Sequence, residues 1–154
     1  MSYSNFQNAM LRAAEFDDYS VGVPVEKEVL QKAEEKLNVH FSKILNEYLG
    51  KYGYVEFGGN EIFGIVKEDF DDLSVPEGCM VEYAVSERLN CQLPESWLPI
   101  YNFDDGYMGF LDFSRKNAEG EPPIIMAIYN GEKYIMVKKI ADDLGDFLLD
   151  LVNE

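Results

Sequence analysis

Apolar side chains recur at helical spacing through the first third of the chain. Residues 5–15 carry apolar positions three or four apart behind Ser4, a candidate N-cap. The same spacing recurs over residues 26–37, with acidic residues in the first turn, where the helix dipole favours them. A third run opens at Ser42 and ends at Gly50 and Gly53, which suit a helix C-terminus. The pattern predicts three helices.

Beyond Gly53 the pattern changes to short β-type runs separated by turn residues. Strands are predicted over residues 54–57, 62–66, 97–103, 108–113, 124–129 and 134–137, the last two forming a hairpin around Asn130-Gly131. Residues 68–76 read as an acidic loop and residues 80–89 as a helix, while a single apolar stripe over residues 140–152 predicts a terminal helix. The order predicts an α+β fold with N-terminal helices, a central, mainly antiparallel twisted sheet, and a C-terminal helix packed on it.

The chain has 154 residues, of which 47% are hydrophobic and 14% aromatic. It is therefore large enough to bury a core and is expected to fold as a single domain over residues 1–154. The N-terminus has no basic start followed by an apolar run, and the longest apolar stretch is far too short to span a bilayer. We therefore expect a cytoplasmic protein without a membrane partner. Cys79 and Cys91 match no metal-binding spacing and are expected to be ordinary reduced thiols.

Negative charge is the most unusual feature of the composition. The net charge is -16, and residues 56–114 hold thirteen acidic residues against only Lys67 and Arg88. Direct nucleic-acid binding is disfavoured because phosphate contacts need clustered Lys and Arg. A partner protein with a basic surface would instead be attracted and steered. The alternative is that the acidic residues only keep the protein soluble.

Three carboxylates, Asp104, Asp105 and Asp112, lie in the stretch IYNFDDGYMGFLDF at residues 100–113. A calcium loop would need oxygen ligands at alternate positions, and counting back from Gly106 puts Tyr101 first and Phe103 third, so that pattern fails. A glycosidase pair would need a set separation across a cleft, which adjacent turn residues do not supply. Asp-Gly flanked by β-type residues is instead typical of a hairpin turn.

Other candidate sites are weaker. His40 is the sole histidine, so the chain cannot build a catalytic triad or a multi-histidine metal site. The glycine-rich stretch at residues 57–64 lacks the lysine of a phosphate-binding loop and favours a hairpin turn. Trp97, the only tryptophan, suits either a core position or a binding hot spot.

Several of these segments together resemble the SUKH superfamily, the Smi/Knr-like domains. Residues 37–59 are similar to the family's helix followed by a Tyr-Asn-Gly-Gly pattern, with Leu49, Tyr52, Gly53 and the Gly58-Gly59 pair matching in type. Asp105-Gly106 followed by Leu111-Asp112-Phe113 matches its turn and Leu-Asp strand, and residues 140–152 resemble its closing helix. The resemblance covers residues 22–152. It departs at Val39-His40 in place of Leu-Pro, at Tyr52-Gly53 without the intervening Asn, and at Tyr107.

The resemblance implies a non-enzymatic immunity protein that binds and neutralises a cognate polymorphic toxin, often a nuclease, without cofactor or metal. An intracellular regulator or scaffold of the Smi/Knr cell-wall type is the alternative, and a carboxylate-dependent hydrolase is a third possibility. We expect the partner to contact acidic residues of two loops and the single tryptophan. These residues are Glu68, Asp69, Asp71, Asp72, Glu77, Trp97, Asp104 and Asp105.

Overall fold

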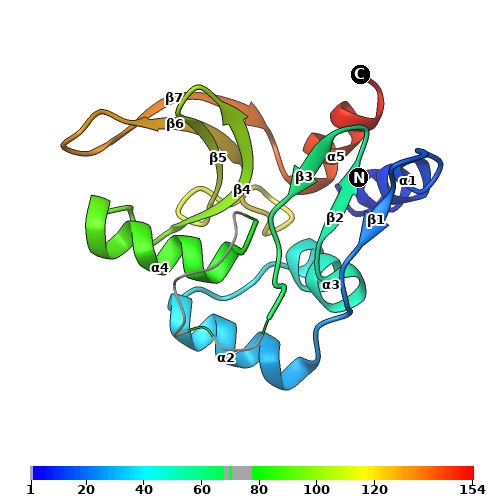
Figure 1. The fold of residues 1–154 in the computed structure, drawn as a ribbon, viewed down its shortest axis with the longest axis horizontal. Coiled ribbons are helices and arrows are strands. Elements are labelled where there is room, and N and C mark those ends of the chain that lie inside the picture. Colours follow the sequence, from blue (N-terminus) through cyan, green and yellow to red (C-terminus); the bar gives the residue numbers. More distant parts are fainter. Residues whose placement is uncertain (1, 68–69, 71–77) are drawn as a thin grey trace.

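The computed structural model describes residues 2–67, 70 and 78–154, which form an α+β fold with two antiparallel sheets (Figure 1). Its helices are α1 (Ser2–Ala13), α2 (Lys27–Leu37), α3 (Lys43–Tyr52), α4 (Met80–Cys91) and α5 (Leu144–Val152). Its strands are β1 (Ser20–Val21), β2 (Val55–Phe57), β3 (Asn60–Ile62), β4 (Trp97–Asp104), β5 (Tyr107–Asp112), β6 (Ile124–Tyr129) and β7 (Tyr134–Ala141). The predicted fold class is confirmed.

The predicted central sheet is divided in two. One sheet has the order β1-β2-β3 and the other the order β4-β5-β6-β7, and all neighbours are antiparallel. The chain crosses between them just after β3, where the amide of Phe63 donates to the carbonyl of Ile100 at 2.9 Å. The strand predicted over residues 62–66 is therefore wrong beyond Ile62, because Gly64 and Ile65 bond instead to Gly78 and Gly53.

Side-chain caps mark the starts of α3 and α5. Ser42 caps α3 by accepting a hydrogen bond from the amide of Leu45 at 3.3 Å, as its side chain suggests. Gly53 ends that helix at φ 73°. The helix predicted over residues 140–152 is wrong at its start: Ile140 belongs to β7, and the buried Asp143 caps α5 by accepting from the amide of Asp146 at 2.9 Å.

The first and last helices pack against each other, as Figure 1 shows for α1 in blue and α5 in red. The hydroxyl of Ser2 donates to the Asp143 carboxylate at the start of α5, and Arg12 donates to Asn153 just after its end. Phe6, Ala9, Met10 and Ala13 are the buried stripe of α1. The helix therefore closes the core from the side on which the chain ends.

Candidate partner-binding surface

Asp104 and Asp105 lie at the tip of the hairpin between β4 and β5. Asp104 pairs with Tyr107, so Asp105 and Gly106 form a two-residue turn, and both have positive φ, 56° and 87°. The Asn102 side chain supports the turn by accepting a hydrogen bond from the amide of Asp104 at 2.8 Å. Both carboxylates are exposed. The predicted turn is confirmed, and it presents two negative charges to solvent.

Asp112, the third carboxylate of that stretch, is buried at the far end of β5. It accepts hydrogen bonds from the amide and hydroxyl of Ser114 at 3.0 and 2.6 Å, and Arg115 lies 3.5 Å away. The carboxylate therefore orders the chain that leaves β5. It is not brought together with Asp104 and Asp105.

Glu61 of β3 faces Asp104 across a small pocket between the two sheets. The pocket has a volume of about 190 Å³ and is lined by Gly59, Glu61, Phe63, Tyr101, Asn102 and Asp104. The Tyr101 hydroxyl donates to the Asn60 side chain at 2.6 Å. Burial, followed by the negative charges of Glu154 and Asp104, raises the pKa of this phenol. The pocket is polar and suits a cationic group.

Asp18 adds another carboxylate beside this pocket. Its two oxygens accept hydrogen bonds from the amides of Gly58 and Gly59, at 2.6 and 2.8 Å. These bonds stabilise the charged form and so lower the pKa of Asp18. Gly58 and Gly59 have φ of 56° and 78°, so the stretch predicted to be a hairpin turn is one. Its amides are occupied by a side chain of the protein itself.

Glu56 and Glu61 lie directly opposite each other on β2 and β3. They line an apolar groove of about 480 Å³ together with Gly22, Val23, Tyr54, Val66, Lys67 and Cys79. Tyr54 donates a hydrogen bond to Glu56. Burial is the main cause that raises the pKa of the Tyr54 phenol and this hydrogen bond is the second, so the phenol stays protonated. We call Asp18, Glu56, Glu61, Asp104 and Asp105 the acidic rim, since they gather around the turn between β2 and β3.

The acidic residues predicted as contacts between β3 and α4 lie outside the described residues. They are Glu68, Asp69, Asp71, Asp72 and Glu77. The nearest described residues on either side of the loop border the acidic rim. Lys67 lines the same groove as Glu61, and a methyl group added at Gly78 would lie 2.5 Å from a Glu61 oxygen.

Trp97 is half-buried at the start of β4, away from the acidic rim. Its ring lies 5.5 Å from that of Phe110 and 6.4 Å from that of Tyr134, centre to centre. The indole is therefore mainly part of an aromatic cluster on the face of the sheet that carries α4, since the Tyr134 hydroxyl donates to Glu87 of that helix.

The single histidine and the two cysteines are the remaining candidate reactive groups. His40 is exposed, with its Nδ1 3.2 Å from a Glu34 oxygen. Cys79 is buried and Cys91 half-buried, and both are free thiols, as expected. Within residues 2–67, 70 and 78–154, the His, Cys, Asp and Glu side chains form no group of three that could hold a metal ion.

A family model described as SMI1-KNR4 cell-wall (SUKH_6) matches residues 27–148, most of the chain. This chain belongs to the SMI1-KNR4 family. The expected resemblance is therefore confirmed. Among curated proteins no sequence matches it significantly. No helix in the described part of the chain combines the length and apolar character needed to cross a membrane.

The residues that carried the resemblance have structural roles in this SMI1-KNR4 domain. A methyl group added at Gly58 would lie 2.8 Å from the Phe16 ring, so the turn packs tightly on the preceding loop. Leu49 is buried in α3, and Phe147 and Leu148 are buried in α5. These positions build the frame that holds the acidic rim.

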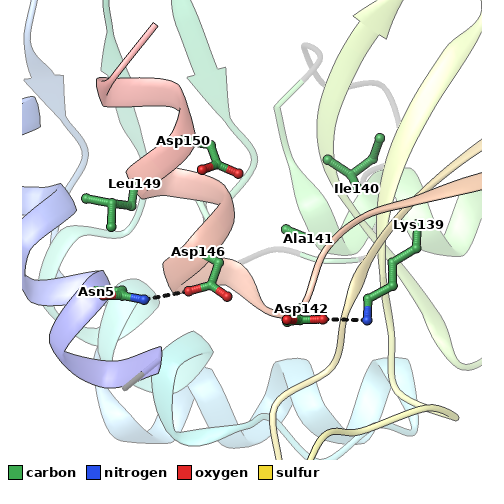
Figure 2. Close-up of a pocket in the computed structure, with 8 residues that line it drawn as sticks. All are labelled: Asn5, Lys139, Ile140, Ala141, Asp142, Asp146, Leu149 and Asp150. Atoms are coloured by element: carbon green, nitrogen blue, oxygen red, sulfur yellow. Dashed lines mark hydrogen bonds and ion pairs between the residues drawn. The ribbon is translucent and has the colours of Figure 1, made fainter.

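The family domain carries a second acidic groove, which the sequence analysis did not identify. It has a volume of about 620 Å³ and lies between α1, α5 and the end of β7 (Figure 2). Asp142, Asp146 and Asp150 point toward it at a spacing of four residues. Asn5 donates to Asp146 at 2.6 Å, and Lys139 pairs with Asp142 at 2.5 Å. These contacts engage two of the three carboxylates that line the groove.

Proposed function

We propose that this SMI1-KNR4 family protein is a non-enzymatic immunity protein. It binds and neutralises a cognate polymorphic toxin protein in the cytoplasm of the cell that makes both, folding as a single domain and requiring no cofactor. Family membership, shown by the match over residues 27–148, is the observation that carries the proposal.

The acidic rim supports a binding mode in which a basic surface of the toxin is covered. Carboxylates far apart in the sequence, such as Asp18, Glu61 and Asp104, lie around one turn. Such a concentration of one sign of charge accelerates encounter with a basic partner. The acidic loop, which lies outside the described residues, and Trp97 remain predicted contacts. A toxin nuclease, whose own substrate is an anion, would offer the required basic surface.

The test uses a toxin domain encoded beside this gene. Co-expression should abolish its toxicity, and the purified proteins should form a stoichiometric complex whose association rate falls as salt rises, because screening acts over about 8 Å at physiological ionic strength. Failure to bind or protect would contradict the immunity role.

A matched pair of variants tests the acidic rim itself. Asp104→Asn with Asp105→Asn removes two charges, and Asn tolerates the positive φ of this turn. We expect association to slow by about two- to tenfold. Glu28→Gln with Glu35→Gln changes the net charge equally on the exposed side of α2 and should leave the rate unchanged.

A regulatory role is the second candidate, favoured by the cell-wall wording of the family description. It predicts that no neighbouring toxin is bound and that deleting the gene alters growth or envelope integrity in cells that contain no toxin.

A further inference from the structure

The four-stranded sheet has one face that the helices cover only in part. Side chains alternate between the faces along a strand, so Phe110 and Tyr134 point toward α4 whereas Tyr107 and Ile135 point to the opposite face. At the other end of that face, Phe147 of α5 packs on the rings of Tyr101 and Phe103 at centre distances of 5.3 and 6.1 Å. Among the described residues, no helix covers the end of this face nearest the hairpin turns, and Figure 1 shows the β6–β7 hairpin projecting there, away from α5.

The open end carries a continuous row of apolar side chains. Tyr107 pairs with Ile128, and Ile128 pairs with Ile135, so the three lie side by side across β5, β6 and β7. Tyr107 is 37% exposed and Ile135 is 42% exposed. Val137 is 47% exposed and lies unpaired at the bulge of β7, where it and Lys138 both lie opposite Met126. Contiguous exposed apolar side chains of this kind mark interaction surfaces rather than ordinary surface positions. We call Tyr107, Ile128, Ile135 and Val137 the apolar row.

The two sides of the apolar row carry opposite charges, which would orient a bound partner. The exposed carboxylates of Asp104 and Asp105 adjoin Tyr107 at the β4–β5 turn. Lys138, which pairs with Met126 on the same face, lies on the other side. A partner with complementary charge would place Lys or Arg over the turn and an acidic group near Lys138.

The outer edge of β7 is poorly suited to pairing with a strand of another protein. Its ladder with β6 shifts register twice, after Ile124 and after Met126, and Lys138 and Lys139 lie along it. Bulges and lysines of this kind oppose edge-to-edge pairing. The face of the sheet, rather than its edge, is therefore the available contact.

We propose that a protein partner docks on the apolar row, placing its own apolar side chains on Tyr107, Ile128 and Ile135 and its Lys or Arg side chains over Asp104 and Asp105. The inference rests on the proposed function, and the partner is the toxin domain. Apolar contacts at the centre supply the lifetime of the complex, while the acidic residues at the border supply fast encounter.

The experiment measures the dissociation constant of the toxin domain encoded beside this gene for the full chain and two variants. Ile135→Thr with Val137→Thr keeps β-branched side chains, so the strand is retained while apolar surface is lost. We expect its Kd to rise at least about tenfold, mainly through faster dissociation. Leu89→Thr, which removes a 69% exposed leucine from α4, is the control and should leave Kd within about twofold.

The outcomes separate this inference from the function on which it rests. Tight wild-type binding with an unchanged Kd for Ile135→Thr/Val137→Thr overturns the apolar row while leaving the immunity role standing. Absence of wild-type binding overturns both. Sedimentation of the chain alone tests whether a second copy of the chain binds to the apolar row. If the wild type is a dimer and Ile135→Thr/Val137→Thr is a monomer, the row serves self-association and the proposal is contradicted. Unfolding midpoints in urea confirm that both variants are folded.

Discussion

The buried carboxylate of Glu121 accepts a hydrogen bond from the backbone amide of Ile44 at 3.2 Å. Ile44 lies in the first turn of α3, where backbone amides have no partner within the helix. The contact spans 77 residues and ties the loop between β5 and β6 to the start of α3. A negative charge at this end of a helix is also favoured by the helix dipole.

Replacing Glu121 with Ala should destabilise the fold by about 1–3 kcal/mol, because the Ile44 amide would remain buried without an acceptor. Glu121→Gln should cost less, since its amide oxygen still accepts. Urea unfolding measures both. Glu119→Ala, at an exposed position in the same loop, serves as the control. Equal losses for the Ala and Gln variants would show that charge, rather than hydrogen bonding, dominates.

Gly58 and Gly59 should respond differently to the same substitution. Both have positive φ, which costs a residue with a side chain about 1–2 kcal/mol. At Gly59 an added methyl group meets open space, whereas at Gly58 it would lie 2.8 Å from the Phe16 ring. We therefore expect Gly58→Ala to lower the unfolding midpoint in urea clearly more than Gly59→Ala. An equal effect would mean that Phe16 moves aside freely.

The link between Asp18 and the glycine turn should depend on pH. Hydrogen bonds from Gly58 and Gly59 lower the pKa of Asp18 in the folded protein, so its stabilising effect is present above its ordinary pKa of about 3.9. This stabilisation is lost as pH falls through the lowered pKa that Asp18 has in the folded protein. Asp18→Asn should therefore be less stable than wild type near neutral pH, and the difference should shrink below about pH 4.

Unfolding midpoints in urea between neutral pH and strongly acidic pH check this expectation. Asp17→Asn makes the same charge change at the neighbouring exposed position and should show a smaller, flatter difference from wild type. A difference for Asp18→Asn that does not change with pH would contradict the role of its ionised form.

Local patterns were enough to predict most elements of this fold. The strand predicted over residues 124–129 coincides with β6, because a run of apolar, β-favouring residues ends at Asn130-Gly131, a strong turn signal. The Asp105-Gly106 turn was predictable for the same reason. The terminal helix was placed too early because Ile140 and Leu144 both face the core although they belong to different elements.

The acidic rim could be anticipated only in part. The excess of acid over residues 56–114 was visible, and Asp104 and Asp105 were named from it. Asp18 and Glu61 were missed because tertiary contacts bring them to the turn, and no spacing along the chain encodes such contacts. The apolar row was missed likewise, since it arises from the register between β5, β6 and β7.

The packing of α1 on α5 has a consequence for synthesis on the ribosome. The contacts of Ser2 and Arg12 join residues 141 positions apart, so α1 cannot complete its packing until α5 has been synthesised. Until then the apolar stripe of α1 has no partner in α5 and is exposed to other surfaces in the cell. Synthesis of α5, rather than formation of either sheet, is therefore the event that ends this exposure, and a ribosome that pauses before α5 is made should prolong it.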